Sequence, residues 1–202
     1  VDSMGDTPVL RYLVYVCPCT VLAGVAGFLV CFVEPLAGGS GIPEVKSYLN
    51  GVHEPGVLET PALLVKGAGI VFSVSAGLPI GKEGPMIHIG ACLAGLLSRA
   101  AVQWRFLQTY RDDIEVRDMV VAGAASGVAA SFSAPLGGVL FALEEGASFY
   151  SPELLLHAFV CCISSTVITH FYFSGKEGSW GDMSASAPVS FGKFEEGSYK
   201  IW

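Results

Sequence analysis

Long stretches without charged side chains set the hydrophobic pattern of this chain. Residues 12–33, 119–143 and 154–175 contain no Asp, Glu, Lys or Arg. A helix needs roughly 20 apolar residues to cross the hydrocarbon core of a bilayer, and each stretch is long enough for one crossing. The pattern therefore predicts an integral membrane protein. The alternative, a soluble protein with buried helices, would have to bury three such stretches in one short chain.

Breaks in the apolar pattern divide the chain into predicted helices. The first runs from Tyr12 to Val33, with a kink expected at Pro18 because proline interrupts the helical hydrogen bonds. A short helix is expected to begin at Pro43, and the polar segment Asn50–Pro61 connects it to the next span. The remaining predicted helices cover 62–78, 85–99, 119–130, a short segment ending at 144–145, and 151–173. The predicted fold class is an all-α membrane protein with broken and tilted transmembrane helices.

Three of these breaks have the same composition, with small residues followed by proline. They read "GSGIP", "GKEGP" and "SAPLGG". An open backbone at membrane depth must be satisfied by protein or by a cavity. Proline near the start of the next helix places a helix N-terminus there, where free N–H groups favour an anion. Each break alone could be an ordinary glycine turn between spans, but the repetition favours an anion pathway.

Four ionisable residues lie close to these breaks. Lys82 and Glu83 stand between two apolar runs, and Glu144 and Glu145 end another. Ionisable groups at membrane depth are costly and usually functional. Glu83 would compete with an anion for the helix N-terminus when ionised and would leave when protonated, so it is a candidate gate and proton carrier. The alternatives are a solvated turn for the first pair and a polar helix end for the second.

Composition narrows the possible functions further. Only 14% of the residues are charged, against about a quarter in soluble domains, and the net charge of −7 excludes a basic nucleic-acid surface. The four arginines at 99, 105, 111 and 117 fall in one connector, which is expected to be cytoplasmic. The six cysteines lie in apolar runs without a His or acidic cluster, so buried thiols are expected, with no metal and no cofactor. A phosphate-binding loop is rejected because "GLPIGKEG" has the wrong glycine spacing and Glu83 where a hydroxyl is needed.

These motifs resemble the CLC family of chloride channels and chloride/proton exchangers. The matching stretches are "GSGIPEVKSYLNG", "GKEGPMIHIGA" and "GVAASFSAPLGGVLFALEEGASF", and the resemblance covers about residues 12–173. It implies that Ser40 coordinates the central anion, that Glu83 is the gating glutamate, and that Glu145 is the internal proton glutamate. The backbone of Gly41, Ile42 and Pro43 would line the same anion site. Lys82, Gly84 and Pro85 would line it around the gate.

The resemblance also separates branches of the family. Channels typically carry an apolar residue at the second position of "LEE", so Glu145 favours a voltage-influenced chloride/proton antiporter. Serine in "GSGIP" is similar to the chloride-preferring members. The combination of "GKEGPMIH" and "LEEGASF" looks most like the lysosomal and plant-vacuolar branch, which implies an endosomal, lysosomal or vacuolar membrane.

The resemblance implies a partial transport domain. Residues 1–173 correspond to the first inverted-repeat half without its opening helix, and residues 174–202, with the second "GKEG", are expected to form a polar non-cytoplasmic loop or frayed end. The expected partners are chloride, protons and the lipid membrane, with a homodimer at full length. Two alternatives stay open, namely a passive chloride channel and a truncated, non-transporting assembly partner.

Overall fold

The computed structural model describes residues 8–52, 55–103, 113–146, 151–176, 178 and 180–181, and these contain helices and turns but no strand. The α-helices are α1 (Pro8–Phe28), α2 (Ile42–Leu49), α3 (Thr60–Ser75), α4 (Glu83–Gln103), α5 (Asp113–Phe132), α6 (Pro135–Phe141) and α7 (Pro152–Lys176). Two π-helical turns, η1 (Leu29–Val33) and η4 (Ala142–Gly146), and one 3-10 turn, η2 (Pro35–Ala37), complete the elements. The predicted all-α class is confirmed.

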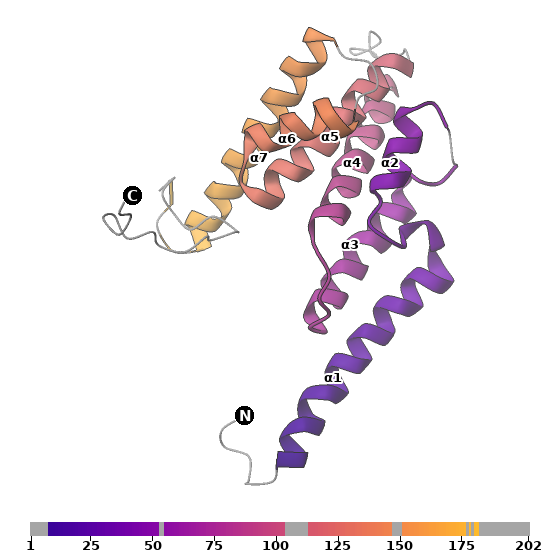
Figure 1. The fold of residues 1–202 in the computed structure, drawn as a ribbon, viewed down its shortest axis with the longest axis vertical. Helices are drawn as coiled ribbons and strands as arrows, with labels where there is room; N and C mark the ends of the chain where they lie inside the picture. Colours follow the sequence, from indigo (N-terminus) through magenta and orange to yellow (C-terminus); the bar gives the residue numbers. More distant parts are fainter. Residues whose placement is uncertain are drawn as a thin grey trace, which may run out of the picture.

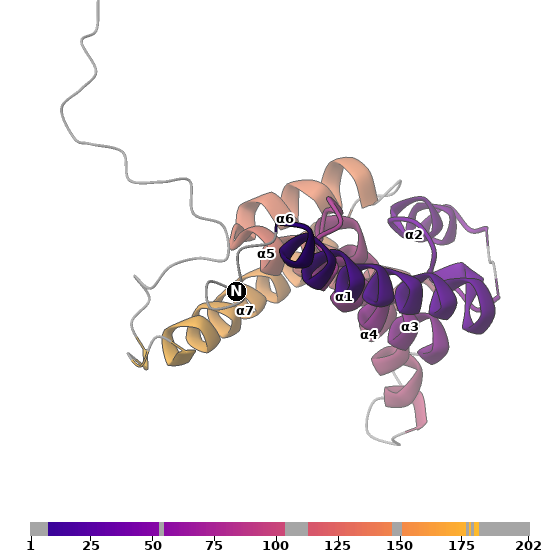
Figure 2. The same ribbon diagram turned by 90° about the horizontal axis from the view of Figure 1, so that it is seen from below.

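Within the described residues, two segments are long and apolar enough to cross a bilayer. They are Val9–Val33, which is α1 with its following π turn, and Pro152–Lys176, which is α7; α3 is a shorter apolar helix. Figure 1 shows α1 extending away from the other helices, and Figure 2 shows it lying along α3, the helix against which it packs. Most of its large apolar side chains are exposed, as a helix in contact with lipid or further protein requires.

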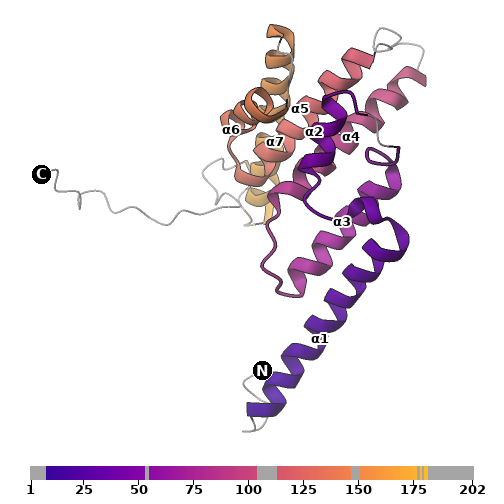
Figure 3. The same ribbon diagram turned by 45° about the vertical axis from the view of Figure 1, so that its right-hand side comes forward.

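The core lies where α5 packs between α4 and α7, with α6 covering the α5–α7 side (Figure 3). Small residues allow α4 and α5 to approach closely, because an added Cβ on Gly123 would lie 2.5 Å from the Ala94 Cβ. A Cβ on Gly127 would overlap the backbone carbonyl of Met86. The glycines of α5 therefore permit the close contact between these two helices.

A buried histidine fixes α4 to the turn that precedes α3. His88 is fully buried, and its ring Nε2 lies 2.9 Å from the Val57 carbonyl oxygen. The Cys92 thiol, one turn along α4, donates to the same carbonyl at 3.4 Å. Two contacts from one helix to one carbonyl hold the start of α4 in place relative to the loop between α2 and α3.

Several helix boundaries differ from the predicted ones. α4 begins at Glu83 rather than Pro85, because proline is tolerated anywhere in a first turn, where its missing N–H costs nothing. α1 continues through Pro18 and changes to a π turn only at 29–33. α7 extends to Lys176, so the second "GKEG" begins inside a helix, where Ser174 is buried and Gly175 packs under the Trp180 ring. The arginines at 105 and 111, residues 177 and 179, and the tail 182–202 lie outside the described residues.

The α4–α5 contact gives a stability prediction. We expect Gly127→Ala to lower the apparent melting temperature of the detergent-purified gene product, because the new methyl must displace the Met86 backbone at a cost of about 1–3 kcal/mol. Gly24→Ala is the matched control, since this glycine also lies within a helix but has nothing within 4 Å of an added Cβ. Equal melting temperatures for the two variants would contradict the packing described.

Candidate anion-binding site

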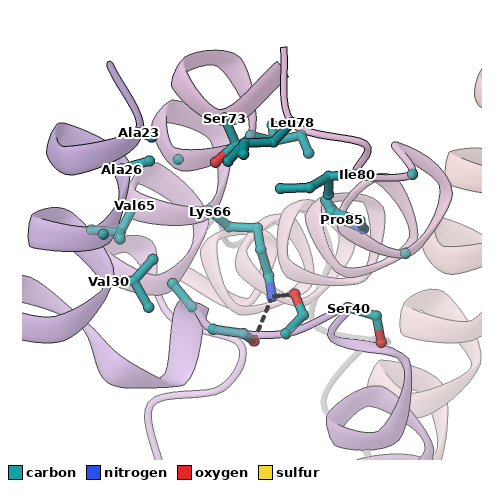
Figure 4. A pocket seen from close by; sticks show the side chains of 18 of the residues that line it. Ala23, Ala26, Val30, Ser40, Val65, Lys66, Ser73, Leu78, Ile80 and Pro85 are labelled. Atoms are coloured by element: carbon teal, nitrogen blue, oxygen red, sulfur yellow. Dashed lines mark hydrogen bonds between the residues drawn. The ribbon is translucent and has the colours of Figure 1, made fainter. Parts of the chain in front are cut away.

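Two of the three broken segments line one cavity of about 740 Å³. "GSGIP" contributes Ser40 and Ile42, and "GKEGP" contributes Glu83, Gly84 and Pro85. The other walls come from α1, η1, α3 and the segment between α3 and α4. In Figure 4, Val30 and Val65 lie at the left, Ser73 and Leu78 at the top, and Ile80 beside Pro85 at the right, with the Lys66 side chain between them. Segments that begin 42 residues apart in sequence thus meet at one largely apolar space.

Glycine at two positions makes this meeting possible. A Cβ on Gly84 would lie 2.7 Å from the Ser40 Cβ, so the first turn of α4 touches the serine directly. Gly41 is buried with φ +84°, a left-handed conformation that glycine adopts without strain. A Cβ there would lie 2.5 Å from the His88 Nδ1, so the space beside Gly41 is filled by the histidine that anchors α4.

Two helix N-termini contribute to the cavity walls. The Met86 N–H donates to the Lys82 carbonyl at 3.1 Å, which leaves the N–H groups of Glu83 and Gly84 without acceptors inside α4. The Ser40 hydroxyl accepts a long hydrogen bond, at 3.4 Å, from the Ile42 N–H at the start of α2. Free first-turn amides and the positive ends of two helix dipoles favour a negative charge in this space.

Lys66 adds a full positive charge to the cavity wall. Only 4% of this residue is exposed, and its ammonium donates to the carbonyls of Gly38 and Gly39, each at 3.2 Å (Figure 4). Glu44 acts on it electrostatically, but no ion pair to Lys66 exists within the described residues. A buried cation that lacks a paired carboxylate attracts a mobile anion. Sequence reasoning missed Lys66, although a lone lysine inside a predicted span is itself a signal.

The acidic residue at the cavity is Glu83. It is half-buried in the first turn of α4, and its carboxylate folds back against Gly81. It therefore lies at the N-terminus of α4, on the wall of the same cavity that Lys66 lines. A carboxylate and a mobile anion would compete for this region, and protonation of the carboxylate would release it to the anion.

The other predicted site residues lie elsewhere. Gly41, Pro43 and Lys82 flank the cavity-lining residues without lining the cavity themselves. None of the described residues of "SAPLGG" lines it, because α6 packs against α5 and α7 through Gly138. Glu145 lies in the π turn after α6 and forms an ion pair with Lys46 in the last turn of α2.

Comparison with known proteins places these features in context. The family model described as "Voltage gated chloride channel" matches residues 21–192. H(+)/Cl(-) exchange transporter 7 of Mus musculus is 43% identical over 85% of this chain and 22% of its own length. Chloride channel protein CLC-c of Arabidopsis thaliana is 45% identical over 80% of the chain and 22% of its own length. Chloride channel protein D of Dictyostelium discoideum is 48% identical over 78% of the chain and 16% of its own length. The chain thus spans about a fifth of the length of these curated relatives.

The buried lysine gives a binding prediction. We expect Lys66→Met to weaken chloride binding to the purified, full-length gene product about tenfold or more in calorimetric titration, because charge-assisted interactions contribute about 1.5–3 kcal/mol. Lys66→Arg retains the charge and should keep most of the affinity. The matched neutral control is Ser73→Ala, at another wall of the same cavity. Unchanged chloride affinity in a folded Lys66→Met protein would show that Lys66 does not contribute to anion binding.

Proposed function

The chain belongs to the voltage gated chloride channel family, and from this premise we propose that it forms part of a chloride/proton antiport pathway. It is a helical membrane protein. The observation that carries the proposal is the cavity at which Ser40, Lys66 and Glu83 come together. A hydroxyl donor, a buried cation and a titratable carboxylate at one space are the groups that anion binding linked to proton transfer requires.

In the proposed cycle, chloride enters the cavity when Glu83 is protonated. The Ser40 hydroxyl and the first-turn amides of α4 then donate to the anion, and Lys66 supplies compensating charge. Loss of the proton returns the carboxylate to the same region and displaces the anion. Chloride and the proton therefore compete through one side chain, which makes Glu83 both the gate and a proton carrier.

The internal carboxylate favours an exchanger over a passive channel. Glu145 does not line the cavity, and it lies at the end of the α6–η4 segment, where it contacts α2. We assign to it the transfer of protons between the cytoplasmic side and Glu83. The 43% identity to proteins named H(+)/Cl(-) exchange transporter 7 supports this assignment. The relatives also include proteins named chloride channels, so the proton route has to be measured.

The wider assignments follow from the same resemblance. Because the chain spans about a fifth of its relatives, we assign residues 1–173 to one half of an inverted-repeat transport domain, with 174–202 as a non-cytoplasmic loop. We further propose that Gly41, Pro43 and Lys82, which are adjacent in sequence to residues that line the cavity, help to shape the anion-binding site. The full-length product is assigned as a homodimer in an endosomal, lysosomal or vacuolar membrane.

Substitution of Glu83 tests whether its carboxylate competes with chloride for the cavity. In liposomes containing the full-length gene product, we expect Glu83→Ala and Glu83→Gln to retain chloride flux while chloride-driven proton movement stops. Both changes remove the titratable carboxylate, and the glutamine variant keeps its shape. Chloride flux is followed with an ion-selective electrode and proton movement with an internal pH dye. Proton movement that persists in both variants would exclude the gating role.

Substitution of the internal carboxylate tests the proton route. We expect Glu145→Val to abolish proton movement and keep chloride flux in the same liposomes, because an apolar side chain cannot carry a proton. The matched control is Glu144→Val, since Glu144 precedes Glu145 in the same π turn and is also exposed to solvent. Equal loss of proton coupling in both variants would count against a specific role for Glu145.

A further inference from the structure

Lys46 connects the proposed proton route to the anion cavity. We propose that it is a positioning residue for proton transfer, and that α2 transmits the protonation state of Glu145 to the loop carrying Ser40. This inference rests on the proposed function and adds a residue to it. Three observations carry it: the ion pair, the position of its two residues on the fold, and the rigid packing of α2.

The short helix α2 connects the two sites. Its first residue, Ile42, lines the anion cavity together with Ser40, and Lys46 lies in its last turn. Ile42 and Lys46 are four residues apart, so at 1.5 Å per residue they are separated by roughly 6 Å, about one turn, along the helix axis. The Lys46 ammonium contacts the Glu145 carboxylate, although 99 residues separate the two in sequence.

The packing of α2 lets it act as a rigid element. Val45, Tyr48 and Leu49 are at most 8% exposed and belong to the core cluster shared with α4 and α5. At the other end, Gly41 packs against His88 of α4. Because α2 is packed at both ends, it moves as one unit and does not bend locally. A displacement of the helix at Lys46 therefore also moves the Ser40 loop.

The exposure of the ion pair allows it to break in each transport cycle. The Lys46 and Glu145 side chains are 40% and 51% exposed, and ion pairs at such positions contribute little net stability. When Glu145 takes up a proton, its carboxylate becomes a neutral acid and the ammonium loses its ionic partner without any change in its own protonation. A fully buried pair would oppose this step at every turnover.

Other charges lie on the elements that pack against the π turn. They are Glu44 on α2, Glu144 in the turn itself, and Asp113, Glu115, Arg117 and Asp118 on α5, whereas α6 carries none. Within the described part of the chain, Lys46 is the cation that forms an ion pair with Glu145. Its removal therefore changes the charge in direct contact with Glu145, and the more distant charges are unaltered.

The test uses the full-length gene product in liposomes with an imposed chloride gradient. For Lys46→Met, we expect chloride flux to persist and the ratio of protons to chloride moved to change about twofold to fivefold. Lys46→Arg keeps the positive charge and should restore the ratio. An effect that came only from the shape of the lysine side chain would not be rescued by arginine. Lys46→Gln is the second neutral variant and replaces Lys46→Met if that protein does not fold.

The Glu145→Val background separates the possible outcomes. In that background, Lys46→Met should have no additional effect on chloride flux or on proton movement, because the carboxylate that Lys46 positions is absent. Two results would overturn the inference alone: an unchanged ratio of protons to chloride in both neutral variants, or an effect that is equally large without Glu145. Absence of chloride-driven proton movement in the unaltered protein would instead overturn the proposed function and, with it, this inference.

Discussion

The approach of the "GSGIP" loop to the first turn of α4 is the contact on which the site depends. Gly84 touches Ser40, and Gly41 leaves room for the buried His88, so neither position accepts a side chain without displacing the other segment. This contact turns two isolated helix starts into adjacent walls of one cavity. Without it, Glu83 would be a charge at a helix end, and Ser40 would be a hydroxyl in a turn.

Lys66 makes that cavity an electrostatic site as well as a space. Helix N-termini carry partial charges that fall off within a turn, whereas a buried ammonium supplies a whole charge. Its hydrogen bonds to the Gly38 and Gly39 carbonyls also hold the loop that leads to Ser40. The same side chain thus positions the loop and sets the sign of the ion that the cavity favours. Glu83 shares the cavity, and we propose that it opposes the anion only when it is ionised, which would link chloride to protons.

The sequence predicted the elements of this site better than their arrangement. Charge-free runs and proline-containing breaks identified the helices and the candidate residues Ser40 and Glu83, because membrane length and helix-start chemistry are local properties. They did not reveal which breaks meet. The packing of α6 against α5 and α7 depends on distant contacts of Gly138, and the pairing of Lys46 with Glu145 spans 99 residues. Local rules also misplaced the start of α4, since proline is acceptable in every position of a first turn.

The location of a bound halide tests the central claim most directly. Bromide replaces chloride and scatters X-rays anomalously, so crystals of the full-length gene product grown in bromide would show the ion as a peak in an anomalous difference map. The account predicts a peak inside the cavity, beside Ser40 and near the Lys66 ammonium, that is stronger in Glu83→Gln because no carboxylate competes. Bromide peaks elsewhere in the protein with none in this cavity, in both the unaltered protein and the variant, would contradict it.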